Sequence, residues 1–345
     1  MNYLKSLYES SPSVSIKLEP NNYKCFKYIS KDNKIISYPT YYDNDKISGL
    51  IELKLNSNKS IIIDSINIFL IGIIQNRNKN ISEKIYEEIL PILEANSSQT
   101  LINEITNFNF CFKQSFKPYE SYFGECIQIK YYLKVIVNTK KEDFSTETIE
   151  NHLEICCLKP ISKNICEDYF LNKNNNKEIN INIGIENVIH VRINLLKTKY
   201  CLDDEITGKI TIVKSETTLN NIFLEIKREE KININNLNLA YCQDLEKFEL
   251  MEGIPEEGDE MCFRFYLNGV KNLSPSYYNT DEKEKKYEVR YFLTFEFNDD
   301  KGYQFFKNVE IEIYRMNLNN LILDNNNKEN NKKTFISIKN KLNDK

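Results

Sequence analysis

A short pattern occurs twice in this sequence, and it limits the folds that are open to the chain. An acidic stretch is followed by Ser-Gly or Thr-Gly and then by an alternating strand, with Gly49 in the first copy and Gly208 in the second. Segments 129–133 and 289–293 also match, and the two offsets, 159 and 160 residues, are nearly equal. A near-constant offset favours duplication over chance. We therefore predict two halves of the same topology, in which each glycine supplies a permissive backbone.

Apolar and polar residues alternate with a period of two through much of the chain. Clear examples are segments 51–56 and 289–297, and the pattern returns at 127–137, 263–267 and 309–313. Such alternation is typical of strands with one buried face. Turn-forming residues lie between these segments. The sequence therefore predicts an all-β fold of two tandem antiparallel β-sandwiches, immunoglobulin-like in class.

One stretch has a different spacing. Its apolar residues recur at intervals of four: Ile81, Ile85, Ile89 and Leu93. Pro91 interrupts the pattern near its end. Intervals of four match one face of a helix. We predict a short helical insertion over residues 80–95.

Two polar stretches predict the limits of the folded parts. Residues 172–177 lie between two strand-rich halves, where few contacts need to cross. From about residue 317 the chain is rich in Asn and Lys, so it cannot bury enough apolar surface to offset the entropy of ordering. We predict an N-terminal sandwich at 1–171, a C-terminal sandwich at 178–316 and a disordered tail at 317–345.

Charge and composition exclude several classes of partner and location. The 46 basic and 50 acidic residues give a net charge of −4. This charge is too small and too evenly mixed to attract a phosphate backbone, so nucleic acid is not an expected partner. No apolar run resembles a signal peptide or a membrane span. We expect a soluble, unsecreted protein whose nine cysteines are reduced thiols in the cytosol.

Residue types that enzymes use form no recognisable motif. The two histidines, His152 and His190, lie in strand-like sequence beside no nucleophile motif. The carboxylates at 203–205 and 256–260 could suggest a calcium site, but they lack the ligand spacing of a calcium-binding loop. We interpret both segments as solvated turns. We predict no catalytic residue, no metal and no cofactor. An enzyme would need a metal or a pocket with carboxylates of perturbed pKa.

Segment 247–255 is a candidate contact for a partner. It places Phe248, Leu250, Met251 and Ile254 next to turn-forming residues, and apolar side chains on a turn favour binding. The alternative is that Phe248 and Leu250 end a strand and cover the core. Periodicity alone favours this alternative.

Seven segments match one family in the same order, and the resemblance spans the chain from about residue 14 to 316. They are 117–124, 184–190, 197–200, 202–210, 247–255, 286–293 and 305–315. In these segments the chain resembles the vacuolar protein sorting-associated protein 26 family, the arrestin-like small subunit of the retromer coat. The resemblance implies two arrestin-like sandwiches and a non-catalytic role.

The same resemblance implies partners and a location. Such a subunit links a large solenoid subunit to sorting nexins, to the cytoplasmic tails of membrane cargo and to the endosomal membrane. Its place would be cytoplasmic and peripheral on endosomes. Its function would be retrieval of cargo from endosomes to the Golgi and to the plasma membrane.

The resemblance also reverses the preference for segment 247–255. It implies that Leu250 and Met251 bind the large subunit, and we add Phe248 and Ile254 to that candidate site.

A second candidate site follows from the same family. The resemblance implies a groove for cargo and a sorting nexin at Ile183 and Phe306, where strand addition needs an edge strand and no catalytic group. It also implies that Asp43 docks a folded domain of a nexin, although the glycine that follows in the family is Asn44 here.

The sequence departs from the family in two places. Residues 76–100 replace a compact loop, and the acidic segment 256–260 lacks a basic residue typical of the family. Two alternatives within the fold remain, a retriever-type paralogue and an arrestin-domain signalling adaptor. The matching segments favour the retromer branch, and the chain has no Pro-Pro-x-Tyr motif of the kind that binds ubiquitin ligases.

Overall fold

The computed structural model of the 345-residue chain forms two compact units. They comprise Met1–Lys159 with Ile232–Leu239, and Pro160–Lys231 with Ala240–Lys345. The described residues are 12–20, 25–30, 32–43, 45–55, 61–94, 99–101, 105–113, 116–140, 146–160, 179–185, 188–234, 237–278 and 286–316. The predicted linker at 172–177 and the predicted tail at 317–345 lie outside these ranges, so the three domain bounds remain predictions.

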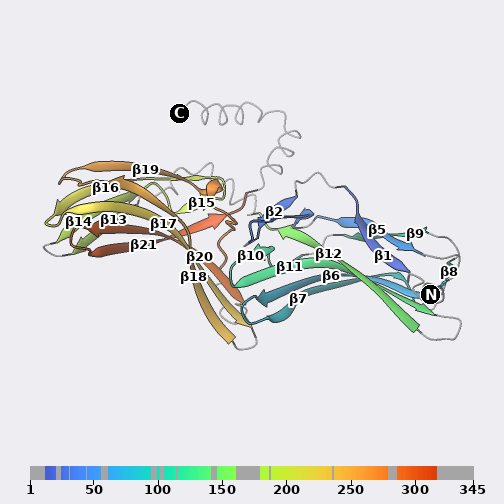
Figure 1. The fold of residues 1–345 in the computed structure, drawn as a ribbon. Coiled ribbons are helices and arrows are strands. Elements are labelled where there is room, and N and C mark those ends of the chain that lie inside the picture. The colour runs from blue at the N-terminus through green and yellow to red at the C-terminus, as the bar shows by residue number, and fades with distance from the viewer. Residues whose placement is uncertain are drawn as a thin grey trace, which may run out of the picture. The chain divides into compact units, whose positions relative to one another are not determined.

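The first unit contains two sheets and a hairpin (Figure 1). The smaller sheet has the order β1 (Ser13–Leu18), β5 (Ile47–Lys54) and β9 (Ile105–Phe112). The larger has the order β4 (Thr40–Tyr42), β12 (Thr146–Leu158), β11 (Ile127–Lys140), β6 (Ile61–Asn76) and β7 (Ile81–Leu93). In addition, β8 (Gln99–Leu101) pairs with β6 and β10 (Tyr122–Phe123) with β11. The hairpin consists of β2 (Phe26–Ile29) and β3 (Ile35–Tyr38).

The second unit contains a four-stranded sheet and most of a five-stranded sheet. The four-stranded sheet has the order β13 (Ile179–Ile185), β14 (Ile189–Leu195), β16 (Glu205–Ser215) and β19 (Glu260–Tyr266). The five-stranded sheet has the order β15 (Lys199–Cys201), β21 (Gln304–Tyr314), β20 (Tyr287–Asp299), β17 (Leu219–Ile234) and β18 (Leu237–Glu252). A short 3₁₀ turn, Leu267–Gly269, follows β19.

The two units have the same strand order. In the first, β4-β12-β11-β6-β7 faces β1-β5-β9, and in the second β15-β21-β20-β17-β18 faces β14-β16-β19 with β13 added. The short strand at one edge is parallel to its neighbour in both units, while most other pairs are antiparallel. This agreement supports the predicted duplication, and the prediction of an all-β fold with antiparallel sheets is confirmed.

The predicted alternation produces the core of each unit. On β5, Ile51 and Leu53 are at most 1% exposed while their neighbours are more accessible. On β20, the residues that face the core are fully buried and include Leu293, Phe295 and Phe297. Phe263 of β19 meets Phe295 of β20 edge to face, with ring centroids 5.7 Å apart. Burial of this apolar surface is the main stabilising contribution to each sandwich.

The repeated glycines are required by space rather than by an unusual backbone angle. A Cβ atom at Gly49 would lie 2.2 Å from the carbonyl oxygen of Lys17, and one at Gly208 would lie 2.6 Å from that of Asn194. A phenylalanine ring of the next strand also covers each glycine. Neither glycine has a positive φ, whereas Gly253, Gly258 and Gly302 do. The expectation of a permissive backbone therefore gave the wrong reason for Gly49 and Gly208, since the neighbouring strands leave no room for a side chain.

The acidic turns also have the same role in both units. An Asp45 Oδ2 atom accepts a hydrogen bond of 2.6 Å from the backbone N–H of Tyr42. Asp204 Oδ2 accepts one of 2.9 Å from the N–H of Cys201. A carboxylate that accepts a backbone N–H stabilises a tight turn. The repeated acidic signal therefore marks the turn before β5 and before β16.

The predicted helical insertion over residues 80–95 is wrong, because β7 (Ile81–Leu93) is a strand paired antiparallel with β6. An interval of four is also an even number, so it fits one face of a strand as well as one face of a helix. Pro91 is tolerated because β7 is the last strand of its sheet, and prolines within sheets are confined to edge strands and bulges. Two register shifts in the β6–β7 pair interrupt strict alternation and obscured the strand signal.

Candidate interaction surfaces

The end of β18 carries the residues predicted to bind a large subunit. Leu250 and Met251 are both half-buried, and as neighbours on a strand they point to opposite faces. Phe248 packs edge to face on Phe265 with ring centroids 4.5 Å apart, as the alternative interpretation held, yet it remains 38% exposed. Ile254, in the following turn, is 69% exposed. The strand end therefore exposes Ile254 and Phe248 to a partner more than it exposes the half-buried Leu250 and Met251.

The turn that follows β18 is held by backbone hydrogen bonds. Gly253 and Gly258 adopt positive φ angles of 117° and 92°, which favour glycine. The N–H of Gly258 donates to the carbonyl of Ile212 over 2.8 Å. In the acidic segment 256–260, Glu260 pairs with Lys209 at 2.9 Å. The turn thus presents Ile254 from an anchored backbone.

An ion cluster that the sequence did not reveal fixes β18 to its sheet. Lys247 Nζ lies 3.0 Å from Glu225 of β17 and 2.6 Å from Glu296 of β20. It also lies 4.4 Å from the centre of the Phe223 ring. Burial alone would lower the pKa of Lys247, but the two carboxylates outweigh it and raise the pKa above its usual range. Because Lys247 reaches across β17 to β20, it holds the outermost strand three residues before Leu250.

Two strand edges surround the predicted cargo residues. Ile183 lies on β13, the outermost strand of its sheet, and only 8% of its side chain is exposed. Phe306 lies on β21 and is 52% exposed. The pairing of β21 with β15 covers only Glu312–Tyr314, so within the described part of the chain the segment 304–311 has no strand on that side. Ile183 is therefore nearly buried on its edge strand, whereas Phe306 is accessible.

Asp43 is less accessible than its predicted docking role suggests. Its side chain is 15% exposed and lies 3.7 Å from Lys159 Nζ. Asp43 Oδ1 accepts a long bond of 3.4 Å from the N–H of Lys117. Lys159 Nζ also donates to the carbonyl of Lys117 over 2.7 Å and lies over the ring of Phe116, which is 70% exposed. Asp43 therefore anchors its turn, and a partner would find Phe116 more readily than the carboxylate.

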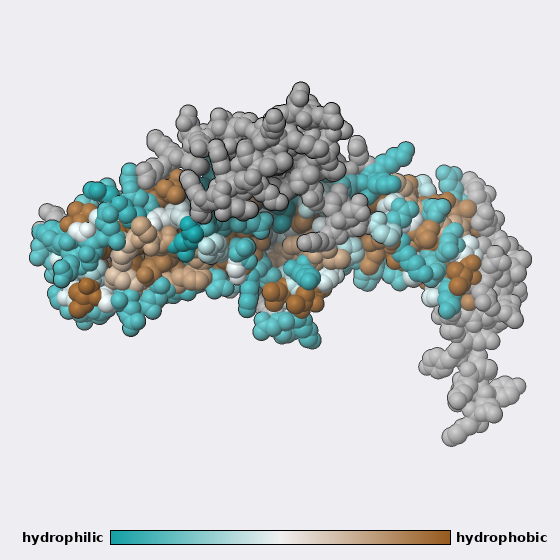
Figure 2. Space-filling view, turned by 90° about the horizontal axis from the view of Figure 1, so that it is seen from above, coloured by the Kyte–Doolittle hydropathy of each residue, from teal (hydrophilic) through white to brown (hydrophobic). Residues whose placement is uncertain are grey.

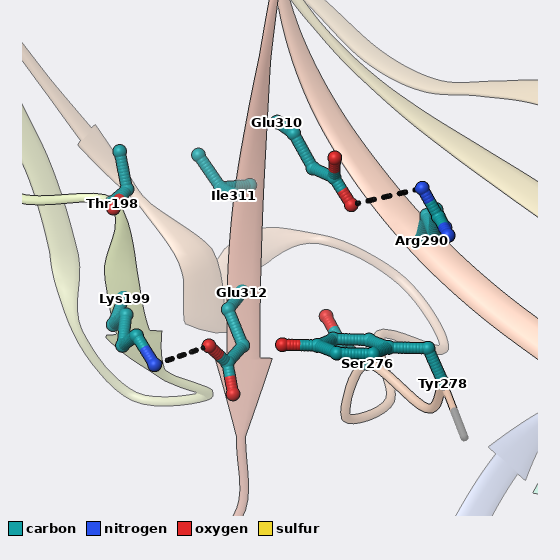
Figure 3. A pocket seen from close by; sticks show the side chains of 8 residues that line it. All are labelled: Thr198, Lys199, Ser276, Tyr278, Arg290, Glu310, Ile311 and Glu312. Carbon is teal, nitrogen blue, oxygen red and sulfur yellow. Dashed lines mark ion pairs between the residues drawn. The ribbon is translucent and has the colours of Figure 1, made fainter. Parts of the chain in front are cut away.

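A pocket of about 390 Å³ opens on the sheet face where β15, β21 and β20 meet (Figure 3). Glu310 and Glu312 of β21 point into it, with Lys199 on one side and Arg290 on the other. The lining residues are Thr198, Lys199, Ser276, Tyr278, Arg290, Glu310, Ile311 and Glu312. No local sequence pattern indicates this pocket, because Ser276 and Tyr278 come from a loop far along the chain from β15.

The remaining chemical groups are dispersed. Among the described residues, no three His, Cys, Asp or Glu side chains are grouped so that they could hold a metal ion. His152 is exposed and meets Tyr132 edge to face at 6.4 Å, and His190 lies on β14 opposite Gly184. No helix within the described ranges has the length and apolar character of a membrane span. On the face shown in Figure 2, apolar groups are small and scattered among hydrophilic ones.

The fold and these surfaces define a tandem β-sandwich protein whose candidate sites are strand ends, strand edges and turns. Comparison with other proteins places it more narrowly. The model of the vacuolar protein sorting-associated protein 26 family matches residues 8–301, and the chain belongs to this family.

Curated relatives agree with the family match over nearly their whole length. Vacuolar protein sorting-associated protein 26 of Plasmodium falciparum is 25% identical over 312 residues, which cover 90% of this chain and 98% of the relative. The protein of the same name from Schizosaccharomyces pombe is 26% identical, with coverage of 89% and 97%. Vacuolar protein sorting-associated protein 26B of Arabidopsis thaliana is also 26% identical, with coverage of 92% and 98%. The family gives the chain a role in vacuolar protein sorting, which is a transport function and not a known class of enzyme.

Proposed function

We propose that this protein is the non-catalytic, arrestin-like subunit of a retromer-type cargo-recognition complex. It links the large solenoid subunit to sorting nexins and to the cytoplasmic tails of membrane cargo. It acts on the cytoplasmic side of endosomes as a peripheral protein, in retrieval to the Golgi and to the plasma membrane. Family membership over residues 8–301 supports the transport role.

The observation that carries the proposed binding of the large subunit is the apolar end of β18, which lies at the edge of its sheet. Leu250 and Met251 lie on opposite faces of an outermost strand, so a partner that clamps the strand end contacts both. Ile254 extends the apolar surface into the turn. A few apolar anchors that become fully buried supply most of the affinity in such interfaces. The ion cluster around Lys247 keeps the strand end in place before binding, which reduces the entropy lost on association.

The open edge of β21 supports the proposed binding of cargo. An extended cargo tail adds as a strand along Phe306, and its main chain supplies most of the hydrogen bonds. Ile183 on β13 belongs to the same candidate groove, and Asp43 with its neighbours is the candidate contact of a nexin domain.

Calorimetric titration of the full chain with the N-terminal part of its organism's large solenoid subunit tests the proposal. Wild type binds, and the double substitution Leu250→Asp/Met251→Asn weakens binding about 30-fold or more, as expected for a hot spot. Ile89→Asp is the matched control, because Ile89 is 55% exposed on β7 of the other unit and its replacement leaves affinity unchanged. A folded wild type that shows no binding would refute the proposal in favour of a retriever-type paralogue or an arrestin-domain signalling adaptor.

A further inference from the structure

The direction of the backbone groups along the open edge of β21 follows from its short pairing with β15. The N–H of Glu312 donates to the carbonyl of Thr198, and the N–H of Leu202 donates to the carbonyl of Tyr314. Both β21 residues therefore direct main-chain groups toward the β15 side. Since alternate residues of a strand direct their main-chain groups the same way, Phe306, Asn308 and Glu310 also do so. Beyond the end of β15, no described residue bonds to these groups.

The side chains of the same three residues form a row on the outer face of the sheet. Ile311 and Ile313 are buried on the core face, with exposures of 2% and 0%, so the alternate residues Phe306, Asn308 and Glu310 lie on the opposite face. Phe306 is accessible at one end of the row, and Glu310 reaches the pocket at the other (Figure 3). An added strand would thus meet an aromatic ring, an amide and a carboxylate in a fixed order.

The carboxylate of Glu310 retains capacity for another cation. Arg290 lies 3.6 Å from Glu310 but only 2.5 Å from Glu288, so Glu288 is its main partner. Glu312 is already paired with Lys199 at 2.7 Å. The Glu310 side chain is 49% exposed and is directed toward Arg290 of β20, while its strand, β21, borders the open edge where a ligand strand would lie (Figure 3).

We propose that the open edge of β21 selects an extended peptide with a basic side chain at Glu310 and an apolar side chain at Phe306, four residues apart. Opposite charges on directly neighbouring strand residues are favourable, and like charges are unfavourable. Antiparallel addition, the more stable arrangement, places the basic residue before the apolar one in the peptide. The inference rests on the proposed cargo function of this edge and specifies the class of cargo tail.

Fluorescence anisotropy with labelled peptides of about eleven residues tests the inference on the full chain. The peptides share a leucine and carry arginine, glutamine or glutamate four residues before it. We expect arginine to bind about threefold tighter than glutamine, with glutamate weakest, as for directly opposite charges on paired strands. In Glu310→Gln the difference in affinity between the arginine and glutamine peptides disappears. The control Glu150→Gln, on β12 of the other unit, removes one negative charge as well, but the difference in affinity remains.

The outcomes separate the inference from the function on which it rests. Equal binding of all three peptides, with loss in Phe306→Asp, would leave the cargo edge in place and refute the selection by Glu310. No binding of any peptide to wild type would refute the edge site itself, and the titration with the solenoid subunit would still decide the coat role. A preference for arginine that persists in Glu310→Gln would also overturn the inference.

Discussion

Replacement of Gly208 by alanine should strongly destabilise the second unit. The new Cβ atom would lie 2.5 Å from Phe263 Cζ and 2.6 Å from the carbonyl oxygen of Asn194, both well inside ordinary contact distance. Phe263 cannot swing away freely, because it packs on the buried ring of Phe295. The strands must therefore separate locally. We expect a loss of about 3 kcal/mol in the free energy of unfolding, at the upper end of the range for overpacked cores.

Gly184 provides the matched control on β13 of the same unit. A Cβ atom there meets nothing nearer than the carbonyl oxygen of Ile189 at 3.9 Å. Gly184→Ala should therefore be neutral or stabilise by about 0.5 kcal/mol, because alanine restricts the unfolded chain.

Urea unfolding followed by circular dichroism measures both variants. With a typical slope of about 1–3 kcal/mol per molar urea, the Gly208 variant should shift the midpoint of its transition down by about 1 M or more. Midpoints of the Gly208→Ala and Gly184→Ala proteins that agree within error would refute the argument from close approach.

Three further predictions concern stability. Burial alone would raise the pKa of Glu225, but its two lysine partners outweigh burial and lower the pKa. The ion pairs therefore stabilise the fold above about pH 4.3, the usual pKa of a free glutamate. This contribution is lost as the pH falls below that value. In urea melts at several pH values, wild type should exceed Glu225→Gln by about 1 kcal/mol at pH 7, and this difference should shrink as the pH falls; a constant difference would contradict the prediction. Tyr131→Phe removes a 2.8 Å hydrogen bond to the carbonyl of Tyr119 and should cost about 1 kcal/mol in the same assay, whereas no change would show that the bond is replaced by water. Pro91→Ala should change stability by less than about 0.5 kcal/mol, since Pro91 lies on an outermost strand, and a large loss would indicate that the proline itself shapes β7.

The fold could be predicted because the core follows a local rule. Alternation at Ile51 and Leu53, and again at Leu293 and Phe295, specifies which face is buried without knowledge of the partner strand. The internal repeat further predicted that the two halves have the same topology. Even so, the reason for Gly208 could not be read from the sequence, because the atoms that exclude a side chain come from β14 and β19.

The failures have the same origin in contacts between distant segments. The strand β7 was mistaken for a helix because an interval of four fits both periods, and only its pairing with β6 decides between them. Leu250 and Met251 point to opposite faces because β18 continues to Glu252. The sequence did not reveal that the strand extends so far, because turn-forming residues follow closely. The cluster around Lys247 joins three strands, and the pocket beside Glu310 joins three strands and a loop, so neither leaves a local signal.

The parallel pairing of β15 with β21 also has a consequence for synthesis of the chain. β21 lies between β15 and β20, yet it is the last of these three strands to leave the ribosome. Until β21 emerges, β15 and β20 each have an unpaired side. In the first unit, β12, the strand that corresponds to β21, has by then already been synthesised. A premature stop before Gln304 would therefore leave a nascent chain with two unprotected strand edges, which are templates for aggregation. Quality-control factors that recognise such edges should act on truncated forms of this protein at the second unit.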